Sequence, residues 1–166
     1  MHTIDIEYEL NRKPHETVTL SYGDKSAEID IGIAPLIYEI WKAGLHTDNS
    51  CEEKKPGIIW ISFISARYCE LFLNIVATYE SGVECLYNRI RWGWRYPYGV
   101  VCDDFWDYDV SPRDYAVEQV LLDDDSIEES FSEPNNFRFS LSVRFPKTDY
   151  PIILERMIAH NNKKKP

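Results

Sequence analysis

Arginines and aromatic rings alternate along residues 89–99, RIRWGWRYPYG, which hold three arginines and four aromatic side chains. In a regular strand the arginines would share one face, and Trp92 and Trp94 would share the other. Like charges two residues apart lie about 7 Å from each other, which costs about 0.6 kcal/mol per pair in water before screening. We therefore expect an anionic group over the arginines, whose planar guanidinium suits both carboxylates and phosphates.

That anionic group has two candidate sources, and the sequence leaves both open. Residues 103–133 contain twelve Asp or Glu and a single basic residue, so the chain could neutralise its own arginines. The other source is a small nucleotide-like ligand, whose phosphates would meet the arginines while its base stacks on a tryptophan turned outward by a bulge at Gly93. The residues predicted for this ligand site are Arg89, Arg91, Trp92, Trp94, Arg95, Arg138 and Arg144.

The segment HTDNSCEE, residues 46–53, contains groups suited to nucleophilic or acid–base chemistry. We expect it to be a loop between a helix and a strand, where sites are common. Cys51 would be the nucleophile and His46 its base. However, the neighbouring Glu52 and Glu53 would raise the pKa of the thiol and oppose thiolate formation. A polar turn around a buried cysteine is therefore favoured over a catalytic pair.

The stretch IAPLIYEIWKAGLHTDNSCEEKKPGIIWISF, within residues 28–76, resembles a pattern in uncharacterised small bacterial and phage proteins. In that pattern a helix rich in Leu, Ile and Trp is followed by Gly, Thr, Ser-Cys with a polar residue, and a strand containing Trp. No activity comes with the resemblance. It implies a shared loop around Cys51 that includes Thr47, Asn49, Ser50 and Glu52, and a host-cytoplasmic location if the protein is phage-encoded.

Two acidic runs, CDDFWDYD (102–109) and DDDSIEES (123–130), suggest a surface for a basic partner. Neither run has the loop glycine and terminal Glu of an EF-hand, so we predict no metal site. Aromatic residues among the acids would anchor such an interface. The predicted partner residues are Asp103, Asp104, Phe105, Trp106 and Asp107.

Composition restricts the class of protein. The 166 residues carry a net charge of −10, which disfavours direct binding to nucleic acid. Neither a secretory signal nor a membrane-length apolar run is visible, so we expect a soluble cytoplasmic protein with no membrane contact. The four cysteines lack metal-binding spacing and are expected to be reduced, with no cofactor. The high aromatic content leaves room for a homodimer or a larger homo-oligomer.

Hydrophobic periodicity predicts an α+β fold, a mostly antiparallel sheet with about three helices packed on one face. Residues 1–160 would form one domain and residues 161–166 a frayed basic tail. Residues 115–122 could be a strand or a short helix. The other predicted elements are a hairpin of 3–10 with 16–22, a helix of about 33–44 capped by Asp30, a strand at 58–63, a helix of 66–82 capped by Ser65, a strand at 137–145 and a helix at 149–161.

The leading hypothesis is a non-enzymatic protein that binds a small anionic nucleotide-like ligand through the strand of arginines and aromatics, with sequestration of that ligand as one form of this function. An alternative hypothesis is an acidic protein–protein inhibitor or nucleic-acid mimic that acts through residues 103–133. A third is an enzyme that depends on Cys51 and His46. The three hypotheses use different surfaces of the chain, so mutation of each surface separates them.

Overall fold

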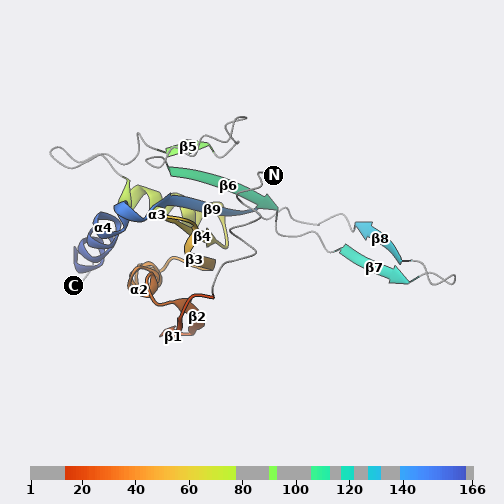
Figure 1. Cartoon of the computed structure of the whole chain (residues 1–166), viewed down its shortest axis with the longest axis horizontal. Helices are drawn as coiled ribbons and strands as arrows, with labels where there is room; N and C mark the ends of the chain where they lie inside the picture. The colour runs from red at the N-terminus through yellow and green to blue at the C-terminus, as the bar shows by residue number, and fades with distance from the viewer. Residues whose placement is uncertain are drawn as a thin grey trace.

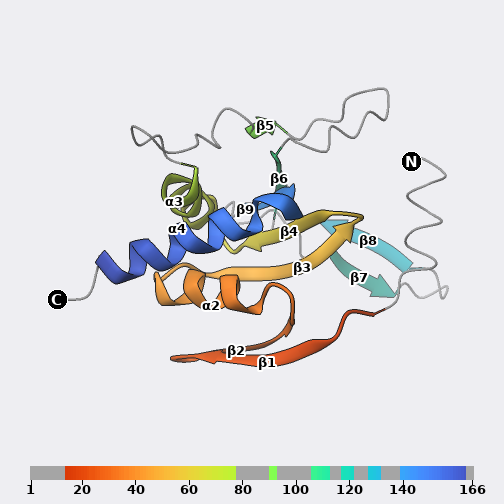
Figure 2. The same cartoon turned by 60° about the vertical axis from the view of Figure 1, so that its left-hand side comes forward.

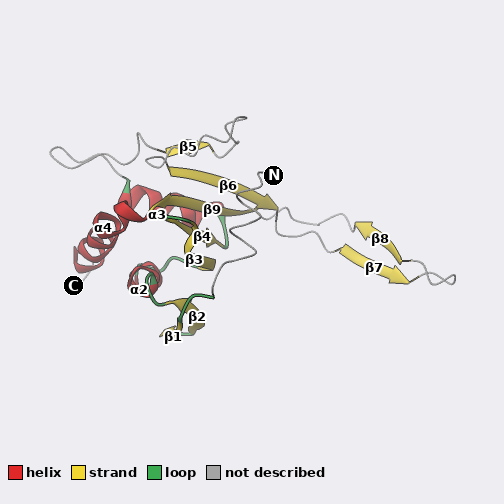
Figure 3. Ribbon diagram, viewed as in Figure 1, coloured by secondary structure: helices red, strands yellow, loops and turns green. Residues whose placement is uncertain are grey.

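A five-stranded sheet forms the centre of the protein in a computed structural model that describes residues 14–77, 90–92, 106–112, 117–121, 127–131 and 139–163 (Figures 1 and 3). Its order is β3 (Thr47–Lys55), β4 (Ile58–Phe63), β9 (Phe139–Pro146), β6 (Trp106–Pro112) and β5 (Ile90–Trp92). Neighbouring strands are antiparallel, except that β5 runs parallel to β6. The predicted α+β class and mostly antiparallel sheet are confirmed.

Three helices share one core with one face of this sheet. They are α2 (Ala34–Lys42), α3 (Ala66–Val76) and α4 (Tyr150–Lys163). Alternate residues of the central strands face them, including Ile59, Ile61, Val143 and Phe145, and all of these are buried with the apolar stripes of the helices. Among the described residues, the helices are too short or too polar to cross a membrane.

An N-terminal hairpin lies beside α2 and the edge strand β3 (Figure 2). It pairs β1 (Thr17–Tyr22) with β2 (Lys25–Asp30) through a two-residue turn in which Gly23 has a φ of 62°, a conformation that glycine adopts without a steric penalty. The predicted partner strand, residues 3–10, lies outside the described residues, so that pairing stays a prediction. The structure shows a partner that follows 17–22 in the chain, residues 25–30, which was not predicted to be a strand.

The helix ends agree only partly with the predictions. Ser65 caps α3 as predicted, accepting a hydrogen bond from the amide of Tyr68 at 3.4 Å. The cap residue of α2 is Ile33, without a side-chain cap, because Asp30 belongs to β2 and its carboxylate is used elsewhere. Helix α3 ends at Val76, earlier than predicted. Helix α4 continues to Lys163, and its residues 161–163 are helical where a frayed tail was predicted.

The predicted loop at residues 46–53 is mostly the edge strand β3. It forms a hairpin with β4 across a turn in which Gly57 has a φ of 72°. Cys51 pairs with Trp60, and the register shifts between Cys51 and Lys55. The prediction was wrong because an edge strand needs little hydrophobic alternation, and Cys51 is the buried residue of the stretch.

A second pair of strands stands apart from the main sheet in Figure 1. It consists of β7 (Val117–Leu121) and β8 (Ile127–Phe131), which pair antiparallel. This settles the ambiguity at residues 115–122 in favour of a strand. The pair lies within the acidic part of the chain and carries Glu118, Glu128 and Glu129.

Candidate functional site

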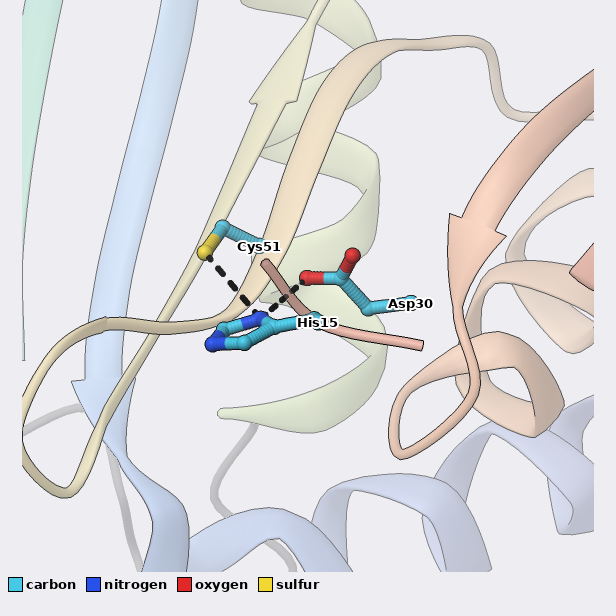
Figure 4. Close-up of side chains that lie close together, drawn as sticks. All are labelled: His15, Asp30 and Cys51. Carbon is cyan, nitrogen blue, oxygen red and sulfur yellow. Dashed lines mark hydrogen bonds and ion pairs between the residues drawn. The ribbon is translucent and has the colours of Figure 1, made fainter. Parts of the chain in front are cut away.

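Three potential metal-ligating side chains from three segments meet at the edge of the sheet (Figure 4). His15 precedes β1, Asp30 ends β2, and Cys51 lies within β3. The His15 Nδ1 atom is 2.9 Å from Asp30 Oδ2 and 3.9 Å from Cys51 Sγ. One donor atom from each residue lies within 4.8 Å of the other two. We call this group the His15–Asp30–Cys51 cluster.

The hairpin explains why these residues meet despite their separation in the sequence. Thr17 pairs with Asp30, so the segment just before β1 runs past the end of β2. The Asp30 carboxylate reaches the outer edge of β3 and accepts a hydrogen bond from the backbone amide of Glu52 at 2.9 Å. Such a contact satisfies an edge-strand donor that would otherwise be open to pairing with another chain.

The cluster is largely shielded from solvent. Cys51 is buried, and the side chains of His15 and Asp30 are 13% and 15% exposed. Burial raises the pKa of Asp30, but the hydrogen bond with His15, the one from the Glu52 amide and a contact with Cys51 outweigh it and hold the pKa below its ordinary value. Asp30 is thus the anionic acceptor at the centre of the group.

Glu52 borders the cluster and is fixed by a close approach to the backbone of Gly32. Its Oε2 accepts a hydrogen bond from the Gly32 amide at 2.6 Å, and its Oε1 is 4.0 Å from His15 Nδ1. A Cβ at position 32 would overlap the carboxylate, so a side chain there would displace Glu52. Burial raises the pKa of Tyr150 at the start of α4. A backbone hydrogen bond with Leu36 lowers this pKa, and the negative charge of Glu52 raises it.

The arrangement does not match a nucleophile–base–acid triad. In a triad the acid and the nucleophile contact opposite nitrogens of the imidazole, whereas Asp30 and Cys51 both approach Nδ1 of His15. His46, the base predicted for Cys51, stacks on Tyr68 with ring centroids 5.0 Å apart and does not join the cluster. His15 was not predicted as a site residue because it lies between the two strands of the predicted hairpin, 3–10 and 16–22, and only the fold of the observed hairpin brings it to Cys51.

The predicted shared loop does not form one constellation. The Thr47 hydroxyl accepts from the indole nitrogen of Trp41 at 2.8 Å, which ties the start of β3 to α2. The Asn49 side chain accepts from the amide of Ser50 at 2.8 Å, a local contact. Of the residues predicted around Cys51, Glu52 borders the cluster.

The predicted arginine site is described only in part, because Arg89, Trp94, Arg95 and Arg138 lie outside the described residues. Backbone register nevertheless places the remaining members. Arg91 of β5 pairs with Asp107 of β6, Asp107 pairs with Arg144 of β9, and Arg144 pairs with Trp60 of β4. These four positions, which we call the cross-strand row, lie on the sheet face opposite to core residues Val143 and Phe145.

Trp92 occupies a different row. It pairs with Tyr108, which pairs with Val143 of the core. The aromatic residue in register with the arginines is therefore Trp60, which the sequence reasoning did not select. Trp60 is partly exposed, and the ammonium of Lys54 lies 6.0 Å from the centroid of its ring. The register that aligns Arg91 with Arg144 depends on the pairing of β6 with β9, which no local pattern in the sequence indicates.

Trp106, one of the residues predicted for the acidic partner surface, is buried in the core. Trp106 was predicted to be exposed, but it is 1% exposed, and its indole nitrogen donates to Asp149 Oδ2 at 2.7 Å. Its ring packs against Phe145 with centroids 5.0 Å apart. The buried acceptor satisfies the indole N–H, so the residue belongs to the core. Of the other predicted residues, Asp103, Asp104 and Phe105 lie outside the described residues and Asp107 is placed only by its backbone.

Comparison with known proteins identifies a viral relative. An uncharacterized protein of Acanthamoeba polyphaga mimivirus is 28% identical over 166 aligned positions, which cover 95% of this chain and 77% of the mimivirus protein. No protein-family model and no solved structure matches the chain. The resemblance to bacterial and phage proteins is therefore wrong, because the relative comes from a mimivirus.

Proposed function

We propose that this protein binds a small anionic ligand of nucleotide-like chemistry over the cross-strand row. The observation that carries the proposal is the register of Trp60, Arg144, Asp107 and Arg91 across four neighbouring strands. Strands are spaced about 4.8 Å apart, so the row extends over roughly 15 Å and offers an aromatic position at one end and arginine positions along it. An aromatic ring beside arginines can stack a base while the guanidinium groups meet phosphate.

The basic residues of the row favour binding of an anion, and the acidic residue among them lowers the expected affinity. Asp107 stands between Arg91 and Arg144 in register, so the chain has an acidic position between two arginine positions. Lys54 adds a further cation beside Trp60. Cations outnumber the carboxylate along the row although the whole chain carries −10. This local excess of basic residues favours binding of an anionic ligand, because one acidic residue cannot neutralise all of them.

Thermal unfolding against a panel of nucleotides, cyclic dinucleotides and ADP-ribose derivatives tests the proposal. A ligand at a hundredfold its dissociation constant adds about 2.7 kcal/mol of stability, which raises the unfolding midpoint by roughly 5 to 11 °C for a domain of this size. Arg91→Gln and Trp60→Leu should each remove most of that rise. Arg67→Gln, an exposed arginine on α3, is the matched control and should retain it.

The results separate ligand binding from neutralisation. If no compound shifts the midpoint of the wild-type protein, or if both row variants respond as the wild type does, the row does not bind an anion. Higher salt should weaken a genuine shift, because screening reduces the attraction between exposed charges and phosphate.

A second candidate function is contact with a basic protein through β7 and β8. The observation that favours it is the position of this acidic pair apart from the main sheet (Figure 1). Fluorescence anisotropy with a lysine-rich peptide tests it, with Glu128→Gln/Glu129→Gln as the variant. Binding that is weaker in the variant and in high salt supports this function, and equal binding by both proteins contradicts it.

A further inference from the structure

We propose that the His15–Asp30–Cys51 cluster is a zinc site that fastens the N-terminal hairpin to the edge of the main sheet. The proposal does not rest on the anion-binding row, because it uses different residues and a different ligand, although Cys51 pairs with Trp60 at the end of that row. It would join three segments that the chain brings together from positions 15, 30 and 51 (Figure 4).

The distances between the donor atoms fit tetrahedral zinc. Zinc binds nitrogen and oxygen at about 2.0–2.2 Å and thiolate sulfur at about 2.3 Å, so tetrahedral ligands lie about 3.4 Å apart for nitrogen and oxygen and about 3.6 Å apart for nitrogen and sulfur. The corresponding separations here are 2.9 Å for His15 and Asp30 and 3.9 Å for His15 and Cys51. Shifts of about half an ångström would therefore bring each of these two pairs to coordinating separation, and the third pair, Asp30 and Cys51, lies within 4.8 Å.

The donor set selects the kind of metal. A thiolate, an imidazole and a carboxylate together suit zinc, which accepts sulfur, nitrogen and oxygen in one tetrahedral shell. Calcium and magnesium bind through oxygen, so a site with Cys51 and His15 disfavours them. Glu52, with Oε1 at 4.0 Å from His15 Nδ1, offers a further carboxylate beside the three donors.

The surroundings hold the donors in place as outer-shell contacts do in metal sites. The amide of Glu52 donates to Asp30 Oδ2, the same oxygen that faces His15, and so orients the carboxylate. Low exposure of His15 and Asp30 limits competition from water. On binding, the Cys51 thiol would release its proton to solvent, and the proton of His15 would reside on Nε2, leaving Nδ1 free to coordinate.

The alternative is a hydrogen-bonded hub without a metal, with the Asp30 carboxylate as the shared acceptor of His15, Cys51 and the Glu52 amide. Both arrangements place the same three side chains together, so a change in stability on mutation does not separate them. Direct measurement of metal binding does.

The test is a titration of the full chain, stripped with a chelator, with Co²⁺ as a spectroscopic substitute and then with Zn²⁺ in competition. A thiolate-to-cobalt charge-transfer band that saturates at one equivalent and is bleached by zinc is expected. Outer-shell changes alone cost about 10- to 100-fold in metal affinity, so Cys51→Ser and His15→Gln should each weaken binding by about 100-fold or more. Zinc should also raise the unfolding midpoint of the wild type by roughly 5 to 11 °C at a hundredfold its dissociation constant.

Matched controls use a cysteine and a histidine outside the cluster. Cys69→Ala removes a buried thiol of α3, and His46→Gln removes the ring stacked on Tyr68; both should bind cobalt as the wild type does. Should Cys51→Ser fail to fold, protection of Cys51 from alkylation by zinc in the wild-type chain gives the same information. Absence of the band, its persistence in Cys51→Ser, or an alkylation rate of Cys51 that zinc does not change would each overturn the proposal.

Discussion

Trp106→Phe is expected to destabilise the protein through one buried hydrogen bond. The indole nitrogen donates to the Asp149 carboxylate at 2.7 Å, and the tryptophan is 1% exposed. A hydrogen bond to a charged group contributes about 1.5–3 kcal/mol. The smaller ring adds about 1 kcal/mol through lost packing against Phe145. The variant should therefore lose about 2.5–4 kcal/mol, which lowers the unfolding midpoint by roughly 5 to 16 °C.

A double-mutant cycle isolates the hydrogen bond from the packing. Asp149 has other interactions as well, so the single variant Asp149→Ala reports more than its contact with Trp106. Urea unfolding of Trp106→Phe, Asp149→Ala and the double variant gives the coupling free energy of the pair. We expect about 1.5–3 kcal/mol, since the indole N–H and the carboxylate are both shielded from water.

The coupling free energy also provides the refutation. A value below about 0.5 kcal/mol would mean that the indole and the carboxylate do not depend on each other, and the buried bond would not explain why Trp106 is in the core. An unchanged denaturant slope in all four proteins is required, because a changed slope would indicate a different unfolded state or a loss of two-state behaviour.

Two other predictions concern α3. Ser65→Ala should lower the free energy of unfolding in urea by about 1 kcal/mol, because the amide of Tyr68 loses its side-chain acceptor. Ser65→Asp retains an acceptor and should lose less. Equal losses in the two variants would show that the cap does not contribute to stability. Burial raises the pKa of Cys69 from 9.0 to about 12, so its thiolate population should be about a thousandfold smaller and alkylation at pH 8 should be slow until urea unfolds the chain. Mass-spectrometric mapping of the modified peptide checks this, and rapid labelling in the native state would contradict it.

The elements that could be predicted are those with a strong local pattern. In β9, Leu141, Val143 and Phe145 alternate with polar residues, and the strand lies where this alternation predicts it. Ser65 caps a helix because its hydroxyl needs only the next turn of the chain. Such patterns depend on neighbours within a few residues, which a sequence displays directly.

The candidate metal site depends on contacts that no local pattern carries. His15 looked like part of a turn and Asp30 like a helix cap, whereas the hairpin makes them neighbours and turns both toward Cys51. The polar edge strand around Cys51 likewise gave no alternation from which to recognise it. Trp106 is surrounded by acidic residues in the sequence, which indicated an exposed position. Its hydrogen-bond partner in the core, Asp149, is 43 residues away and could not be recognised from those neighbours.

The position of β9 also affects the order in which the protein can be built. This strand lies between β4 and β6 in the sheet, although about 75 residues separate β4 from β9 in the chain. During synthesis, therefore, the β3–β4 hairpin emerges with one side of β4 unpaired and with Ile59, Ile61 and Phe63 lacking their neighbours. Non-local pairing of this kind slows folding and leaves a strand edge open to other chains. Nascent chains that end before residue 139 should consequently depend on chaperones, and completion of the sheet should follow only when its central strand has left the ribosome.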